Sequence, residues 1–354
     1  MSELKTLDKK PKVLYFPWEL KIHDEESWKT LNEKFEVIDY DCESVEHFIK
    51  ECEKTDGKFS DIDAICRSVH FFGPPFGKQQ IFGADVVKYL PKSIKIIVSG
   101  GHGYDHVDIK TLTEKNILYC NSPNCCAIAT ADVGTFLVLQ SFRYLTYAEH
   151  QTRKQDIADM SKISYEAQNP RGRTLGIIGL GDIGIYVARA CKALGMNIVY
   201  NNRNPKPQYE AEIEGLKFLP DVNDLFAVSD CIVVLCPYSE ATRHLINFEA
   251  FKKMKDRVRL VNIARGAIVE EAAVIDALER GQLVGAGFDV TEFEPKFDDR
   301  ILNNYKVTIL PHIGATSRDS FEAFEKKCVE NLVEYFYGSG QPGAVNPELF
   351  EKKD

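Results

Sequence analysis

The sequence contains no apolar run long enough to cross a bilayer and no excess of positive charge. Its 44 Lys and Arg residues are outnumbered by 53 Asp and Glu residues, which gives a net charge of −9. This balance argues against a general binding surface for nucleic acid or for anionic membranes. The first ten residues include five charged ones and no apolar signal segment. We therefore expect a cytoplasmic protein with neither a nucleic-acid nor a membrane partner.

Patterns typical of metal sites and disulfide frameworks are also missing. The ten cysteines include no Cys-x-x-Cys pair, and several, such as Cys66 and Cys231, stand in apolar runs. Buried thiols explain this pattern better than a zinc site or a redox dithiol does. The adjacent Cys125 and Cys126 are interpreted in the same way. Reduced thiols and no metal ion are therefore expected.

The length and the patterning predict two α/β domains. A chain of 354 residues exceeds one ordinary domain. Short β-branched runs, such as 13–16, 36–39 and 94–99, alternate with helical patterns along its whole length. Strict alternation predicts parallel sheets with helices on both faces. The expected fold is a pair of Rossmann-like, doubly wound domains, one a flavodoxin-like substrate domain and the other a dinucleotide-binding domain.

Two long helical patterns suggest how these domains are joined. Residues 127–147 and 317–337 carry apolar side chains at helical spacing and are expected to carry the chain from one domain to the other. We accordingly assign residues 11–126 and 318–354 to the substrate domain. Residues 127–317 are assigned to the dinucleotide-binding domain.

A glycine motif opens the second domain. An apolar run at 175–178 leads into three glycines spaced Gly-x-Gly-x-x-Gly, and a helical pattern and a second β-branched run follow. In such a unit one glycine permits the turn, one lets the backbone approach a pyrophosphate, and one lets helix and strand pack closely. The helix N-terminus then faces the phosphates. The motif predicts dinucleotide binding by Gly179, Gly181, Asp182, Ile183 and Gly184.

The residues after the second β-branched run indicate which dinucleotide is preferred. NAD-binding units usually place an acidic residue about 20 residues beyond the glycines to bind the ribose 2′-hydroxyl. Here that position holds Asn202, followed by Arg203, and the first acidic residue downstream is Glu210. A carboxylate would repel a 2′-phosphate, whereas Arg203 could pair with it. Asn202 and Arg203 therefore favour NADPH, with NAD still possible.

Three further residues have side chains of the types used in catalysis. Arg265, Glu294 and His312 each follow an apolar run with the pattern of a strand. Because α/β enzymes bind ligands at the carboxyl ends of their strands, these side chains can converge on one crevice. Taken singly, each could be an ordinary loop residue. Together they predict a catalytic site.

The motifs around this trio resemble those of the D-isomer-specific 2-hydroxyacid dehydrogenase family. The matching segments are Asn262 to Gly266, Asp289 to Pro295 and Pro311 to Gly314, with similar intervals between them. The resemblance extends to 101–108 and 121–132 and so covers nearly the whole chain. Within the family, the sequence is most similar to the branch of D-mandelate dehydrogenases and fungal glyoxylate or hydroxypyruvate reductases.

The resemblance implies a role for each member of the trio. Arg265 would bind the carboxylate and the carbonyl oxygen of a 2-oxo acid, since a guanidinium can fork onto two oxygens. His312 would donate the proton to that carbonyl oxygen, and Glu294 would orient the His312 ring. Backbone N–H groups of His102 and Gly103 would hold the substrate carboxylate.

Other residues are predicted to contact the substrate or the cofactor. Phe71 could pack against a bulky substrate side chain, although it could equally fill the core of its own domain. Asp289 would meet the nicotinamide carboxamide. The remaining cofactor-binding residues implied are Thr130, Cys236, Pro237, Thr242, Ile263, Ala264, Gly314 and Ala315.

The leading hypothesis is therefore an NADPH-dependent reductase that converts 2-oxo acids to D-2-hydroxy acids. Its substrate would be of the benzoylformate and phenylpyruvate type or of the glyoxylate and hydroxypyruvate type. A homodimer is implied by the resemblance. The alternative is a nucleotide-sensing, corepressor-like binding protein without significant turnover, because such proteins keep the same trio. A formate dehydrogenase would need a glutamine where Glu294 stands.

Overall fold

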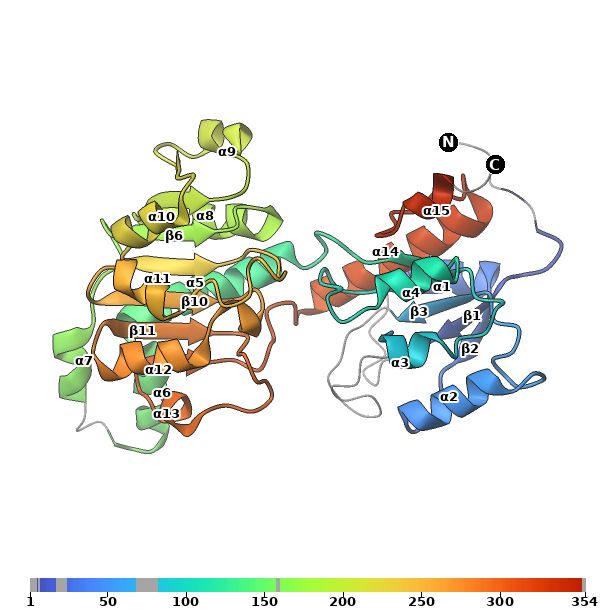
Figure 1. The fold of residues 1–354 in the computed structure, drawn as a ribbon, viewed down its shortest axis with the longest axis horizontal. Helices are drawn as coiled ribbons and strands as arrows, with labels where there is room; N and C mark the ends of the chain where they lie inside the picture. The colour runs from blue at the N-terminus through green and yellow to red at the C-terminus, as the bar shows by residue number, and fades with distance from the viewer. Residues whose placement is uncertain (1–4, 6, 17–23, 68–81, 157–159, 352–354) are drawn as a thin grey trace. The chain divides into compact units, whose positions relative to one another are not determined.

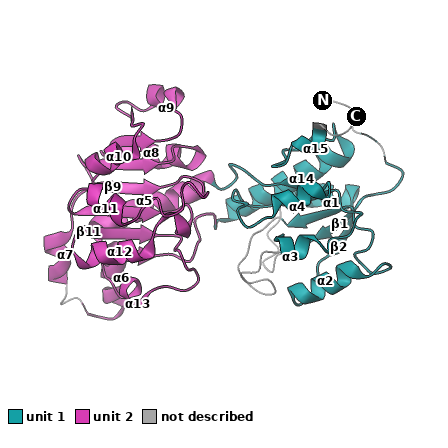
Figure 2. Ribbon diagram, in the orientation of Figure 1, with its two compact units in different colours: residues 1–126, 316–354 teal, residues 127–315 magenta. Residues whose placement is uncertain are grey.

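Each half of the protein is built on one parallel sheet. The structure, a computed structural model, describes residues 5, 7–16, 24–67, 82–156 and 160–351. It separates unit 1, residues 1–126 with 316–354, from unit 2, residues 127–315, as Figure 2 shows in teal and magenta. Unit 1 has a five-stranded sheet and unit 2 a seven-stranded one. The predicted α/β fold class with two doubly wound domains is confirmed.

The sheet of unit 1 has the strand order β2-β1-β3-β4-β5, and its neighbouring strands are parallel (Figure 1). Its strands are β1 Lys12–Tyr15, β2 Glu36–Asp39, β3 Ala64–Arg67, β4 Ile96–Ser99 and β5 Leu118–Cys120. Its helices are α1 Glu25–Lys34, α2 Val45–Glu53, α3 Ala84–Val87, α4 Ile109–Glu114, α14 Arg318–Tyr337 and α15 Glu348–Glu351. This is the flavodoxin-like order.

Helices cover both faces of this sheet because neighbouring strand residues point to opposite sides. On one face Leu14 and Ile97 belong to a core that includes Phe48 of α2. On the other face Val13 packs in a core that includes Leu332 of α14. The C-terminal helix α14 therefore completes the domain that the N-terminal residues begin.

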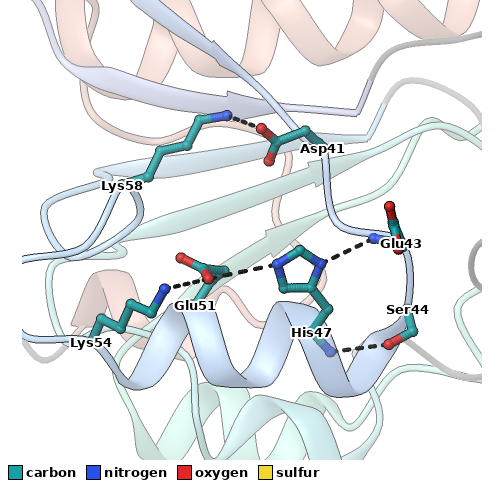
Figure 3. A network of polar contacts seen from close by, with 7 residues as sticks. All are labelled: Asp41, Glu43, Ser44, His47, Glu51, Lys54 and Lys58. Atoms are coloured by element: carbon teal, nitrogen blue, oxygen red, sulfur yellow. Dashed lines mark hydrogen bonds and ion pairs between the residues drawn. The ribbon is translucent and has the colours of Figure 1, made fainter.

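Polar side chains fix the start of α2, as Figure 3 shows. The N-cap residue Ser44 accepts a hydrogen bond from the backbone N–H of His47 at 3.1 Å. In turn, Nδ1 of His47 accepts one from the N–H of Glu43 at 3.3 Å, and its Nε2 lies 3.6 Å from Glu51 Oε1. Exposed pairs of this kind add little to the free energy of unfolding. The network is helix capping at the surface of unit 1.

The sheet of unit 2 has the order β12-β11-β10-β9-β6-β7-β8, again with parallel neighbours. Its strands are β6 Thr174–Ile178, β7 Asn197–Asn201, β8 Lys217–Phe218, β9 Cys231–Val234, β10 Val258–Asn262, β11 Leu283–Phe288 and β12 Val307–Ile309. Its helices are α5 Ala127–Arg143, α6 Leu145–Arg153, α7 Met160–Glu166, α8 Asp182–Ala193, α9 Pro207–Glu212, α10 Val222–Val228, α11 Phe248–Lys253, α12 Glu271–Glu279 and α13 Asp299–Leu302. The turn η1, Gly266–Ile268, precedes α12.

Two cores flank this sheet. Leu137 of α5 and Val187 of α8 lie in one of them, and Phe226 of α10 and Phe251 of α11 lie in the other. Helix α5 packs so closely on the sheet that a Cβ atom added to Gly285 of β11 would lie 2.1 Å from the Ser141 carbonyl oxygen. A residue with a side chain at that position would push the helix off the sheet.

The helix predicted over 127–147 is divided in two. Helix α5 ends at Arg143, and the backbone of Tyr144 takes the left-handed conformation with φ 52°. The buried Tyr144 hydroxyl donates to the Val284 carbonyl at 2.6 Å, and Oε1 of Gln140 accepts from the N–H of Thr146 at 2.8 Å. These two bonds end one helix and cap the next.

Among the residues that the structure describes, no helix has the length and apolarity that a bilayer span requires. All ten cysteines fall among the described residues, and none of them forms a disulfide.

Candidate functional site

The glycine turn between β6 and α8 gives its glycines distinct surroundings. Gly179 has φ 102°, and a Cβ atom there would lie 2.5 Å from the Cys236 backbone nitrogen. A Cβ on Gly184 would lie 2.7 Å from the Gly179 carbonyl oxygen. A Cβ on Gly181 would meet no atom of the described residues within 4 Å. The turn therefore leaves space above Gly181, next to the start of α8, whose first N–H groups are of the kind that bind a phosphate.

This difference gives a matched pair of variants. Gly179→Ala should lower the free energy of unfolding by about 2 kcal/mol or more, because it combines a left-handed backbone with a clash against Cys236. Gly181→Ala should unfold like the wild type but bind NADPH at least about 10-fold more weakly, because its methyl group would occupy the space a pyrophosphate needs. Thermal unfolding and NADPH fluorescence titration measure the two effects. Equal NADPH affinity in Gly181→Ala and wild type would show that phosphate does not approach this turn.

At the end of β7 the side chains of Asn202 and Glu210 are hydrogen-bonded within the protein. Oδ1 of Asn202 accepts from the Leu180 N–H at 2.6 Å, and its Nδ2 donates to the Leu180 carbonyl at 3.0 Å. Glu210 accepts a hydrogen bond from the hydroxyl of Tyr200. Asn202 therefore holds the glycine turn, and no carboxylate of the described residues is free there to bind a ribose. Arg203 is exposed and has no ion pair or hydrogen bond among the described side chains.

The loop after β9 is organised by its own hydroxyl groups. Oγ1 of Thr242 accepts from the Ser239 N–H at 2.8 Å and donates to the Pro237 carbonyl at 2.9 Å. Cys236 at the start of this loop lies against Gly179, and burial raises the pKa of its thiol to about 11. Cys236 is therefore a neutral group beside the glycine turn.

Arg265 stands on a turn that a buried asparagine shapes. Asn262, the last residue of β10, accepts through Oδ1 from the Ala264 N–H at 3.1 Å and donates through Nδ2 to the Arg265 carbonyl at 2.9 Å. Nη1 of Arg265 donates to the Ala264 carbonyl at 2.7 Å. These bonds fix the backbone from which the guanidinium projects.

A buried aspartate shapes the turn that carries His312. Asp289 follows β11, and its two carboxylate oxygens accept from the N–H groups of Ile313 and Gly314, each at 2.8 Å. The backbone of His312 has φ 57°, a conformation unusual for a residue with a side chain. A Cβ on Gly314 would lie 3.3 Å from the Thr130 methyl group. Three residues predicted to bind the cofactor, Thr130, Asp289 and Gly314, are thus neighbours.

The strand ends that carry the trio are joined by backbone hydrogen bonds. The Asp289 N–H donates to the Asn262 carbonyl at 3.0 Å, and the His312 N–H donates to the Asp289 carbonyl at 2.9 Å. Nδ1 of His312 lies 3.2 Å from Glu294 Oε1. Because β10, β11 and β12 are adjacent, Arg265, Glu294 and His312 lie at one edge of the sheet.

This arrangement permits proton transfer. Both members of the His312–Glu294 pair are partly exposed, at 27% and 31% of their side-chain surface. Since Glu294 faces Nδ1, the other ring nitrogen, Nε2, is on the opposite side of the ring and is the one suited to reach a ligand. A carboxylate–imidazole pair and a guanidinium at the same edge of one sheet have the chemistry to bind an anionic carbonyl compound and exchange a proton with it.

Of the three unit 1 residues predicted to bind substrate, two lie in the described part of the chain. The loop after β4 holds an exposed His102, whose carbonyl accepts from Nδ2 of Asn121 at 2.7 Å. Gly103 follows it and is half-buried. Phe71 lies outside the described residues.

Sequence reasoning gave no role to Asn262, His244 or Glu292. Asn262 orients the Arg265 turn, as described above, and Nε2 of His244 lies 2.6 Å from Glu292 Oε1. A polar residue that ends an otherwise apolar strand could have identified Asn262. Nothing in the sequence indicates that His244 and Glu292 meet.

Known proteins resemble this chain in sequence and in fold. A family model described as D-isomer specific 2-hydroxyacid dehydrogenase, NAD binding domain, matches residues 135–314. The chain is 37% identical over 251 residues to 4-methyl-2-oxopentanoate reductase A of Aspergillus oryzae. These residues make up 71% of this chain and 74% of that protein. The solved structure of Rhodotorula graminis D-mandelate dehydrogenase in its holo form has a TM-score of 0.85 at 32% identity, covering 92% and 94% of the two chains. A glyoxylate reductase from Paecilomyes thermophila has a TM-score of 0.81 at 32% identity, covering 92% and 95%.

Proposed function

The chain belongs to the D-isomer-specific 2-hydroxyacid dehydrogenase family, and from that premise we propose that it reduces 2-oxo acids to D-2-hydroxy acids with NADPH. Family membership and the named relatives support an NAD(P)-dependent oxidoreductase acting on 2-oxo acids. The observation that carries the proposal is the contact of Nδ1 of His312 with Glu294 at 3.2 Å, beside the turn of Arg265.

The proposed mechanism assigns one task to each side chain. Arg265 binds the substrate carboxylate and polarises the C2 carbonyl. When bound, the nicotinamide supplies the hydride that adds to C2. His312 donates the proton on Nε2 to the carbonyl oxygen, so that the product is a neutral hydroxyl group. Glu294 accepts from Nδ1 and keeps the imidazole ring in the donating orientation.

NADPH is the preferred dinucleotide in this proposal because the end of β7 offers it a cation and no competing acid. Arg203 is exposed, Asn202 is bound to Leu180, and Glu210 is bound to Tyr200. A carboxylate free to bind the 2′-hydroxyl of NAD is therefore missing from the described residues of this region. Arg203 would pair with the 2′-phosphate, and NAD would bind more weakly.

Changing Arg203 to Ala tests the choice of dinucleotide. The KM for NADPH should rise by about 10- to 100-fold, the range expected for loss of a charge-assisted bond, while the KM for NADH changes less than about 2-fold. Initial rates over a range of each nucleotide measure this. Arg189→Ala is the control, because it removes the same charge from a residue paired with Glu212. A rise no larger in Arg203→Ala than in Arg189→Ala would mean that the phosphate is bound elsewhere. We prefer Arg203 to Asn202 for this test, because Asn202→Asp would also break the bond to the Leu180 carbonyl.

The relatives support a 2-oxo acid substrate with either a small or a bulky side chain. Those named above act, by their names, on mandelate, on glyoxylate and on 4-methyl-2-oxopentanoate. Either a small 2-oxo acid, such as glyoxylate or hydroxypyruvate, or a bulky one, such as phenylpyruvate or benzoylformate, fits this proposal.

The proposal includes a cytoplasmic homodimer built through unit 2. Exposed apolar side chains occur on three successive helices of this unit: Phe136 of α5, Leu145 of α6 and Tyr165 of α7. Tyr165 is 90% exposed. Covering such side chains would stabilise an association of two copies.

A further inference from the structure

A second histidine–carboxylate pair lies near the Arg265 turn. Nε2 of His244 is 2.6 Å from Glu292 Oε1, and Glu292 Oε2 accepts from the N–H of Glu271, the first residue of α12, at 2.9 Å. The side chains of His244 and Glu292 are 24% and 11% exposed. Both carboxylate oxygens of Glu292 are thus bound within the protein, on the same loop as Glu294.

This loop is also pressed against the turn beside Arg265. A Cβ atom on Gly266 would lie 1.9 Å from the Thr291 carbonyl oxygen and 2.6 Å from the Glu292 backbone nitrogen. The N–H of Glu294 points back to the same Thr291 carbonyl at 3.5 Å. Glu292 is therefore the last anchored side chain before the chain reaches Glu294.

His244 comes from the loop after β9, which carries Pro237 and Thr242, two residues predicted to bind the cofactor. Its backbone has φ 51°, and its N–H donates to the Ala267 carbonyl at 2.9 Å. A side chain on such a disfavoured backbone is held in place by its surroundings. The imidazole of His244 therefore joins the β9 loop to the loop of Glu294.

We propose that Glu292, held by His244, is a positioning residue for the Glu294–His312 pair. This inference rests on the proposed function. Glu292 fixes the backbone from which Glu294 reaches His312, and His244 connects that backbone to the β9 loop, which carries Pro237 and Thr242. Loss of the contact between His244 and Glu292 should therefore lower kcat, because kcat depends on proton donation by His312. It should change the KM for the 2-oxo acid much less, because the Arg265 turn keeps its bonds to Asn262.

Two substitutions of His244 separate a lost hydrogen bond from a lost ring. In His244→Gln the amide nitrogen lies as many bonds from Cα as Nε2 does in histidine, so it can still donate to Glu292. His244→Ala has no donor. We expect kcat to fall about 10-fold or more in His244→Ala, the effect of a misplaced catalytic group, and to stay within about 2-fold of wild type in His244→Gln. Equal losses in both variants, or none in either, would overturn the proposal.

A double-mutant cycle then tests whether Glu292 acts through Glu294. If it does, Glu292→Ala combined with Glu294→Ala should lower kcat no further than Glu294→Ala alone. A kcat in the double variant that falls by the product of the two single losses would overturn the proposal. Thr291→Val serves as a control in the same loop, because the buried Thr291 hydroxyl has no hydrogen-bond partner among the residues that the structure describes, and kcat should not change. An inactive wild type would overturn the proposed function and this inference together, whereas an active wild type with normal kcat in His244→Ala would overturn the inference alone.

Discussion

Replacing His312 with Ala is expected to lower kcat for the reduction of a 2-oxo acid by about 10²- to 10⁴-fold, the usual contribution of a general acid. The affinity for NADPH should stay within about 2-fold of wild type, because the glycine turn and Arg203 are at other strand ends. Steady-state rates and NADPH fluorescence titration measure the two quantities.

His312→Asn is the matched control for this prediction. Asparagine tolerates the left-handed backbone that His312 adopts, and its amide nitrogen can take the place of Nδ1 opposite Glu294. It lacks a proton donor at the position of Nε2. The Asn variant should therefore be well folded and as inactive as the Ala variant. Substantial activity in either variant would remove His312 as the proton donor.

Changes at Arg265 should produce the second large effect. Arg265→Lys keeps the positive charge but loses the planar fork, and kcat/KM for the 2-oxo acid should fall about 10²-fold. Arg265→Gln also loses the charge that polarises the carbonyl, and kcat/KM should fall about 10³-fold or more. Rates at varied 2-oxo acid, with saturating NADPH, measure both losses.

The order of these losses is itself a test. A fork that binds carboxylate and carbonyl together predicts a large effect even for lysine, whereas simple charge attraction predicts that Lys is nearly as good as Arg. Near-normal kcat/KM in Arg265→Lys would therefore contradict the two-oxygen contact proposed for Arg265. Because Asn262 holds this turn through backbone groups, neither substitution should displace the loop.

Much of the fold could be predicted because its signals are local. Alternating strand and helix patterns predicted two parallel sheets, and strand ends predicted where Arg265, Glu294 and His312 would lie. The three glycines of the turn were each predicted with a distinct steric role, and Gly179, Gly181 and Gly184 have distinct surroundings. In each case neighbouring residues carry the information.

Features that depend on contacts between distant residues were not predictable. The helix from Ala127 was expected to continue through Tyr147, but it ends at Arg143 because the Tyr144 hydroxyl bonds to Val284, far away in the sequence. Asn202 was considered only as the position that lacks an acid, whereas its amide holds Leu180. The pairing of His244 with Glu292 joins two loops that no local pattern relates.

The most direct test of the proposed activity is the initial rate of NADPH oxidation by the purified protein, with NADH measured in parallel. The four acceptors are glyoxylate, hydroxypyruvate, phenylpyruvate and benzoylformate. We expect turnover of at least one of them, faster with NADPH than with NADH, and a product of the D configuration. Which acceptors react then tells whether the substrate pocket suits a small or a bulky side chain. No oxidation of either nucleotide with any acceptor would contradict the proposed activity and favour a nucleotide-binding protein without turnover.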